Sequence, residues 1–168
     1  MIKIVFTGPE CSGKTSLSKA IAKKFNLPIV PEFARLYLNK LNRNYNYSDL
    51  IKIAKGQLDL EIKTEKNSDK KILICDTNLQ VIKLWSLIKY SKCDSFIINH
   101  EDHQAHYILC YPDFKWQYDK LRENKYDRLE IFEKYKEDLV TSNRNFITTN
   151  GPIADRISLI TNYIEQMI

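Results

Sequence analysis

The stretch GPECSGKT, from Gly8 to Thr15, constrains the fold of this chain most strongly, because it matches the phosphate-binding pattern G-x-x-x-x-G-K-[ST] in full. An apolar, β-branched run from Ile2 to Phe6 precedes it, and apolar residues recur at helical spacing after it: Leu17, Ala20, Ile21 and Phe25. The stretch should therefore join a buried strand to a helix N-terminus, where unpaired backbone N–H groups favour an anion. A chance glycine-rich turn is the alternative, and the flanking strand and helix argue against it.

Within this loop, Gly8 and Gly13 supply backbone freedom, and Lys14 can reach the β- and γ-phosphates of a nucleotide. The Thr15 hydroxyl is placed to ligand a Mg²⁺ ion that bridges the same phosphate oxygens. We therefore expect ATP and Mg²⁺ as cofactors. The expected nucleotide-binding residues here are Gly8, Pro9, Glu10, Cys11, Ser12, Gly13, Lys14, Thr15 and Ser16.

The length of 168 residues predicts a single domain with a substantial core. Lys and Arg total 26 against 21 Asp and Glu, and the resulting net charge of +5 suits a polyanionic ligand such as a nucleoside triphosphate. The basic residues are scattered in short pairs, which argues against a nucleic-acid surface. Whether the chain forms a homo-oligomer is left open.

The four cysteines show no C-x-x-C spacing, which fits a reduced compartment. The N-terminus begins directly with a predicted strand rather than a signal peptide, and no apolar run is long enough to cross a bilayer. These features predict a soluble cytoplasmic protein that has no membrane partner.

Hydrophobic periodicity predicts five strands that alternate with helices. The expected strands are residues 2–6, 27–32, 72–76, 107–110 and 146–148. The expected helices follow the phosphate-binding loop, begin again near Phe33, cover 48–66 with Ser48 as the cap, then 79–90 and 126–140, and close the chain after Pro152. The expected inward-facing residues of these later helices are Phe33, Leu36 and Tyr37; Ile51, Ala54, Leu58 and Ile62; Val81, Leu84, Trp85 and Ile88; Leu129, Phe132, Tyr135 and Leu139; and Ile153, Ile157, Ile160 and Ile164. This order is typical of an α/β P-loop NTPase fold, with a doubly wound, mostly parallel sheet of five strands and helices on both faces.

Two carboxylates stand at the ends of predicted strands. Asp76 closes the apolar run ILICD, and ligands of open α/β sheets collect at such carboxyl ends, so Asp76 should face the magnesium and phosphate site. The alternative is that Asp76, or Asn78 beside it, only caps the next helix. Glu32 lies three residues before Arg35 on one helical face, where an ordinary exposed ion pair is the alternative to a role in the site.

Three histidines, His100, His103 and His106, are spaced H-x-x-H-x-x-H. On one helix they could approach a common metal ion. Since no cysteine joins them, a solvated helix end that leads into the fourth strand is the interpretation we favour.

The segment at about residues 111–128, YPDFKWQYDKLRENKYDR, is too polar and aromatic for a core element. A long connection in a compact domain is more often a functional lid, and Arg122 and Arg128 could close over phosphates. Trp116 offers an aromatic face to a flat cation, with Asp113 and Asp119 near it in sequence. An exposed charged loop anchored by Trp116 is the alternative.

With GPECSGKT, PEFARLYL, ILICDT, YPDFKWQYDKLRE and NGPIADR in this order, nearly the whole chain resembles the ribosylnicotinamide kinase domain of the NadR type. The motif PEFAR and the arrangement of Trp116, Asp119 and Arg122 narrow the resemblance to this family. It implies transfer of the γ-phosphoryl group of ATP to the 5′-hydroxyl of nicotinamide riboside, which gives nicotinamide mononucleotide for NAD synthesis. Because this domain often follows an adenylyltransferase domain, which has no room here, we expect a stand-alone kinase or an excised domain.

The resemblance also assigns roles to residues. It implies catalytic roles for Lys14, Asp76, Glu32, Arg122 and Arg128, metal contacts for Thr15 and Asp76, an adenine-side turn at Asn150, Gly151 and Pro152, and substrate contacts for Glu32, Arg35, Gln57, Asp76, Thr77, Trp116 and Asp119. Two positions depart from the family pattern, since Asn78 replaces a second aspartate and Lys120 replaces a glycine. The first departure leaves open whether Asp76 or Glu32 is the base, and the second concerns the lid conformation. The acceptor could also be another nucleoside or nucleotide, and a nucleotide-dependent regulatory module is an alternative of a different class.

Overall fold

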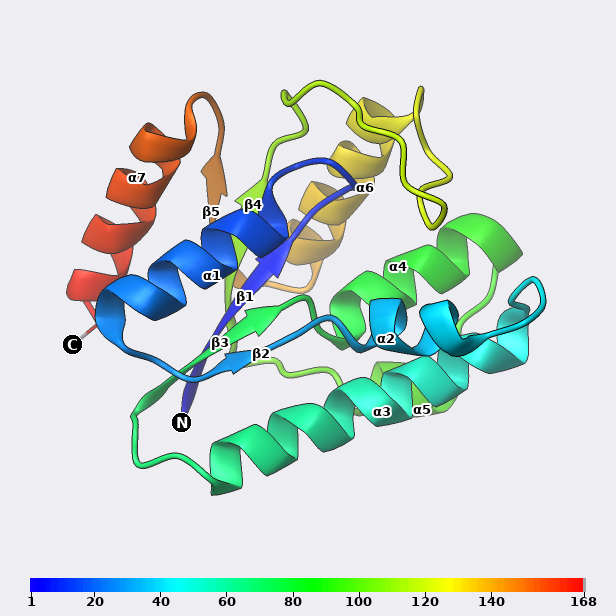
Figure 1. Ribbon diagram of the computed structural model, residues 1–168, viewed down its shortest axis with the longest axis horizontal. Coiled ribbons are helices and arrows are strands. Elements are labelled where there is room, and N and C mark those ends of the chain that lie inside the picture. The colour runs from blue at the N-terminus through cyan, green and yellow to red at the C-terminus, as the bar shows by residue number, and fades with distance from the viewer. Residues whose placement is uncertain (168) are drawn as a thin grey trace.

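The computed structural model describes residues 1–167 and shows five strands and seven helices in alternation (Figure 1). The strands are β1 (Ile2–Thr7), β2 (Ile29–Val30), β3 (Ile72–Asp76), β4 (His106–Cys110) and β5 (Asn145–Thr149). The helices are α1 (Lys14–Phe25), α2 (Phe33–Lys40), α3 (Tyr47–Lys66), α4 (Leu79–Tyr90), α5 (Ser95–Asn99), α6 (Arg128–Thr141) and α7 (Ile153–Glu165). No helix within residues 1–167 combines the length and apolar character needed to span a membrane.

All five strands are parallel, in the order β2-β3-β1-β4-β5. The first strand therefore lies in the centre, with β3 on one side and β4 on the other. Because every strand runs the same way, the loops after β1, β2, β3, β4 and β5 gather at one edge of the sheet, where ligands of such folds bind. The predicted P-loop fold with a parallel five-stranded sheet is confirmed.

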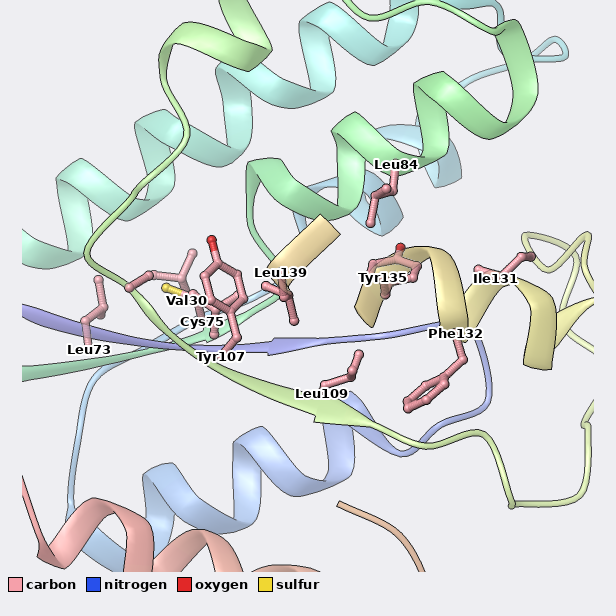
Figure 2. Packing of buried hydrophobic residues seen from close by; sticks show 12 residues of the cluster. Val30, Leu73, Cys75, Leu84, Tyr107, Leu109, Ile131, Phe132, Tyr135 and Leu139 are labelled. Carbon is pink, nitrogen blue, oxygen red and sulfur yellow. The ribbon is translucent and has the colours of Figure 1, made fainter. Parts of the chain in front are cut away.

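Alternate residues of each strand enter different cores, as the two-residue period of a strand requires. One core packs Ile4 and Phe6 of β1 against α1 and α7. The other packs Val5 of β1 and residues of β3 and β4 against α4 and α6; Figure 2 shows Leu84 of α4 above Tyr135 and Leu139 of α6. A third cluster joins α2, α3, α4 and α5 beyond the sheet.

Several inward faces differ from expectation. In α3 the buried face contains Leu50, Ile53 and Gln57, whereas Ile62 is exposed. Asn46 rather than Ser48 caps this helix, because its side chain accepts from the Ser48 N–H in a capping box with Asp49. Hydrophobic periodicity predicts that one face of the helix is buried. The packing of neighbouring helices decides which of two adjacent rows of residues forms that face.

Four other helices show the same kind of deviation. Leu36 of α2, Ile88 of α4, Leu129 of α6 and Ile153 of α7 are exposed rather than inward. The second strand is also shorter than predicted, since only Ile29 and Val30 pair with β3, between Pro28 and Pro31.

Candidate active site

The phosphate-binding loop connects β1 to α1 at the carboxyl edge of the sheet (Figure 1). Gly8 has φ +124°, and a Cβ there would lie 2.7 Å from the Cys110 carbonyl oxygen of β4. Gly13 has φ +87°, and its Cβ would lie 2.8 Å from the Phe114 ring. Both glycines are therefore required by the backbone conformation and by the close approach of neighbours. They give the loop the strand-to-helix geometry expected of an anion cradle.

Lys14 folds back over the loop that it follows. Its ammonium group donates to the carbonyl oxygens of Gly8 at 2.8 Å and Pro9 at 2.7 Å, which holds the charge at the mouth of the loop. The Ser12 hydroxyl donates to the same Pro9 oxygen at 2.7 Å. A mobile cation in this place can attract the terminal phosphates of a nucleotide.

Asp76 and Glu32 lie close enough to influence each other. Burial raises the pKa of the Asp76 carboxyl, while a hydrogen bond from Thr15 and the charge of Lys14 act in the opposite direction. Burial also raises the pKa of Glu32, and the charge of Asp76 adds to this effect against Lys14 and Arg35. Carboxyls with a raised pKa at the end of a sheet are typical of a functional site.

The cap of α4 is Asn78, whose side chain accepts from the Gln80 N–H at 3.1 Å. Asp76 is therefore free of the capping role that we weighed for it. Its buried Oδ1 atom has no hydrogen-bond partner anywhere in residues 1–167. An orphaned carboxylate oxygen next to the first threonine of α1 fits a hard cation with oxygen ligands, so Asp76 and Thr15 suit Mg²⁺.

A cavity of about 270 Å³ opens beside the phosphate-binding loop. Its lining contains the whole loop from Gly8 to Ser16, the polar residues Glu32, Arg35, Arg122, Glu123 and Asn124, and the apolar or aromatic residues Ala34, Leu38, Tyr45, Val81, Trp85, Ile88, Leu121, Ile131 and Tyr135. The lining thus combines polar groups, including those of the loop, with apolar and aromatic side chains. Such a lining suits a ligand with a polar sugar and a flat ring.

Two aromatic residues that sequence reasoning did not assign to the site form part of the apolar lining. The rings of Tyr45 and Trp85 meet edge to face, with centroids 4.9 Å apart, and the Trp85 indole donates to the Tyr45 hydroxyl at 3.0 Å. Trp85 and Val81 were expected to face the core, and both pack against core clusters while they also line the cavity. Helical spacing alone does not show that an inward side chain also forms part of a cavity wall.

Residues 111–127, all of them within the described chain, form neither helix nor strand, and we call them the β4–α6 segment. Asp119 of this segment accepts from Arg35 at 2.8 Å. Glu123 accepts from Lys89 of α4 at 2.8 Å and from the Tyr45 hydroxyl at 2.8 Å. The segment thereby covers the cavity, and Arg122 is part of the lining.

The other expected site residues in this region lie outside the cavity lining. Arg128 donates to the Phe114 carbonyl at 2.9 Å and to the Cys11 carbonyl at 3.5 Å, so it ties the β4–α6 segment to the phosphate-binding loop. The Trp116 indole donates to Glu10 at 3.2 Å, and Asp119 is engaged by Arg35. These residues shape the cover of the cavity.

Gln57 and Thr77 lie behind the cavity. The Gln57 side chain is buried, accepts from the Phe33 N–H at 2.9 Å and donates to the Thr77 carbonyl at 3.4 Å. Gln57 therefore connects α3 to the start of α2, next to Glu32, and to the residue that follows Asp76. These two backbone contacts fit a supporting role for Gln57.

Arg156 of α7 is a buried residue that the sequence did not single out. Its guanidinium donates to the carbonyls of Gly151 at 2.8 Å, Ser12 at 3.1 Å and Tyr111 at 3.2 Å, and pairs with Asp113. It thus ties the expected adenine-side turn, residues 150–152, to the phosphate-binding loop. The motif NGPIADR carried this signal, since a charged residue within an apolar helical face needs a partner.

The three histidines do not converge. His100 ends α5 and contacts the Phe96 carbonyl at 2.8 Å, His103 lies in a turn, and His106 begins β4 and contacts the Tyr163 hydroxyl at 2.9 Å. No group of three potential His, Cys, Asp or Glu metal ligands occurs within residues 1–167. The metal interpretation of the spacing therefore has no support in the structure.

The parallel sheet, the phosphate-binding loop after its central strand and the carboxylate after the adjacent strand define a P-loop nucleotide-binding protein. The sequence family described as an AAA domain matches residues 3–156, and the chain belongs to this family. Among curated proteins, no relative matches the sequence at a significant level.

Solved structures share the fold. The crystal structure of NadR protein in complex with NR has a TM-score of 0.69 and 20% identity, over 89% of this chain and 46% of that one. Deoxyadenosine kinase from M. mycoides, with products dCMP and dCDP, has a TM-score of 0.60 and 18% identity, over 98% of this chain and all of that one. Thymidylate kinase from Ehrlichia chaffeensis has a TM-score of 0.61 and 18% identity, over 99% and 97% of the two chains. The expected likeness to the NadR-type domain is confirmed at the level of the fold, and this chain spans about half of the NadR chain.

Proposed function

We propose that this chain is an ATP-dependent kinase that phosphorylates the 5′-hydroxyl of nicotinamide riboside to give nicotinamide mononucleotide. One observation carries the proposal: the phosphate-binding loop and Glu32 line the same cavity as the aromatic pair Tyr45 and Trp85. A nucleoside that enters this cavity ring first presents its 5′-hydroxyl to the loop. The fold shared with NadR, whose structure contains NR, supports this choice of acceptor.

In this proposal the carboxylates of Glu32 and Asp76 have different roles. Glu32 lines the cavity, so it is the residue placed to orient the sugar hydroxyl and accept its proton. Asp76 is buried next to Thr15, and these two residues would hold Mg²⁺, which neutralises charge on the phosphates. The raised pKa of Glu32 suits a proton acceptor better than that of an ordinary exposed carboxyl.

Lys14 and Arg122 supply the positive charge. Lys14 stands at the mouth of the loop, and Arg122 belongs to the lining contributed by the β4–α6 segment, which we propose to be a lid. Positioning and charge neutralisation provide most of the acceleration in phosphoryl transfer. Arg128 helps indirectly, because it fixes Phe114 on Gly13 of the loop.

The cationic nicotinamide ring would contact Tyr45 and Trp85. We assign to this pair the aromatic role that the sequence suggested for Trp116, because the pair lines the cavity. Glu32 and Glu123 in the same lining add the negative potential that a cationic ring favours.

A second candidate keeps the mechanism and changes the acceptor to a deoxynucleoside or a nucleoside monophosphate, since deoxyadenosine kinase and thymidylate kinase share the fold over nearly the full length of this chain. The experiment that separates the candidates is an ATP-consumption screen with nicotinamide riboside, the common nucleosides and their monophosphates. We expect the highest kcat/KM with nicotinamide riboside. A preference for a neutral nucleoside or for a monophosphate would replace the first candidate by the second, and ATP hydrolysis that ignores every acceptor would favour a regulatory module.

A further inference from the structure

A carboxylate inside a phosphate-binding loop needs an explanation. Glu10 lies between Gly8 and Gly13, whose backbone forms the anion cradle, and a negative side chain there opposes the binding of phosphates. The structure turns this side chain toward the β4–α6 segment. The contacts of Glu10 with this segment, rather than with a nucleotide, therefore indicate its role.

The Glu10 carboxylate accepts three hydrogen bonds from the segment. Oε1 accepts from the Trp116 indole N–H at 3.2 Å and from the Asn124 backbone N–H at 2.7 Å. Oε2 accepts from the Glu123 backbone N–H at 3.1 Å. Hydrogen bonds to an ionised acceptor are about twice as strong as neutral ones.

The three donors lie on both sides of Arg122 in the sequence. Trp116 precedes Gln117, whose carbonyl holds the Arg122 guanidinium at 2.7 Å, while Glu123 and Asn124 follow Arg122 directly. A single carboxylate therefore fixes both flanks of the arginine in the cavity lining. The segment forms neither helix nor strand, so it has no regular backbone hydrogen bonds to offer these N–H groups. The Glu10 carboxylate supplies the acceptors instead.

We propose that Glu10 is a positioning residue of the reaction, which holds Arg122 and the roof of the cavity, Leu121 to Asn124, in register with the phosphate-binding loop. This inference rests on the proposed kinase function. Glu10 acts through Arg122, because its carboxylate is engaged by the hydrogen bonds from Trp116, Glu123 and Asn124. It also joins the two halves of the site, because the loop binds the nucleotide and the roof covers the acceptor.

The test compares Glu10→Ala and Glu10→Gln with the wild-type chain, and uses Glu133→Ala, the loss of an exposed carboxylate on α6, as the control. We expect Glu10→Ala to lower kcat with nicotinamide riboside about 10- to 100-fold, since a misplacement of about 1 Å can cost that much, and to raise the KM of the acceptor. The KM of ATP should stay equal or fall, because the repulsive charge is gone. Glu10→Gln, which keeps one acceptor oxygen, should lose less kcat than Glu10→Ala.

Hydrogen–deuterium exchange supplies a readout that does not depend on activity. Peptides that cover residues 121–126 should exchange faster in Glu10→Ala than in the wild type, with Glu10→Gln in between and Glu133→Ala unchanged. A higher KM for ATP with unchanged kcat and unchanged exchange would overturn the proposal and make Glu10 a nucleotide-binding residue. If the wild-type chain phosphorylates no acceptor, the proposed function fails, and the same exchange experiment still decides whether Glu10 holds the segment.

Discussion

Arg156 offers the sharpest test of how the site is held together, because its side chain has no solvent exposure. We consider its replacement by Met, which has a similar length and no charge. The substitution removes the donors to the carbonyls of Gly151, Ser12 and Tyr111, and it removes the ion pair of Asp113, which keeps only the hydrogen bond from the Gly151 N–H. It also removes the guanidinium that stacks on Phe114, 4.3 Å from the ring centroid.

The expected cost follows from these contacts. A hydrogen bond to a charged group contributes about 1.5–3 kcal/mol, and breaking a buried ion pair costs about 3–5 kcal/mol. The contacts share one group and are not additive, and Asp113 is 30% exposed, so we take about 3–5 kcal/mol for the whole substitution. At roughly 2–4 °C per kcal/mol for a domain of this size, Tm should fall by about 6–20 °C.

Thermal unfolding followed by circular dichroism measures the effect, and two variants bracket it. Arg156→Lys keeps the charge but loses the planar fork, and should lie between wild type and Arg156→Met. Asp113→Asn leaves the three carbonyls bonded and should lower the free energy of unfolding less than Arg156→Met does, because the carboxylate side of the pair is 30% exposed. If Arg156→Met shifts Tm no more than Asp113→Asn does, the reasoning about buried carbonyls is refuted.

The remaining predictions concern chemistry. Lys14→Ala should abolish turnover while the circular dichroism spectrum stays unchanged, because its ammonium serves the loop and the phosphates; near-normal kinase activity would contradict the phosphate-site assignment. Asp76→Asn should lower kcat far more than it raises the KM of either reactant, because contacts to a metal strengthen at the transition state, and Glu32→Gln should do the same if Glu32 is the base. A change confined to the acceptor KM would reduce either residue to a binding role. Burial raises the pKa of Glu32 above its ordinary value of 4.5, so the acidic limb of the pH profile of kcat/KM should lie above 4.5, with activity lost as the pH falls through it. An unchanged limb in Glu32→Gln would assign it to another group. Trp85→Ala should weaken nicotinamide riboside by about 2- to 30-fold, as 0.5–2 kcal/mol of cation–π energy implies, and leave ATP affinity unchanged. The expectation that Trp116 makes this contact is tested beside it: an equal loss in Trp116→Ala, with neutral nucleosides unaffected, would return the role to Trp116.

Much of this architecture follows from the sequence, and the parts that do not share a physical cause. The phosphate-binding loop and the strand that ends at Asp76 are local patterns, and both were predicted from adjacent residues. The place of Trp85 in the cavity lining and the buried contacts of Arg156 were missed because their partners come from distant parts of the chain: Tyr45 in one case, and Ser12 and Asp113 in the other. Periodicity says that a side chain points away from solvent, but not whether it meets a core, a cavity or a carbonyl.

The β4–α6 segment shows how this limit bears on function. It forms neither helix nor strand along residues 111–127, so its shape is determined by partners on other elements: Glu10 in the phosphate-binding loop, Arg35 on α2, Lys89 on α4 and Arg156 on α7. Arg156 is buried and anchors Asp113 near the start of the segment, whereas the ion pairs of Asp119 with Arg35 and of Glu123 with Lys89 are partly exposed. Partly exposed pairs contribute only about 0.2–1 kcal/mol apiece, so these two pairs alone hold residues 119–123 weakly. In the lid function that we propose, residues 119–123 would open and close over the cavity while the start of the segment stays anchored by Arg156. The polar composition that made the segment unfit for a core would thus serve the proposed lid.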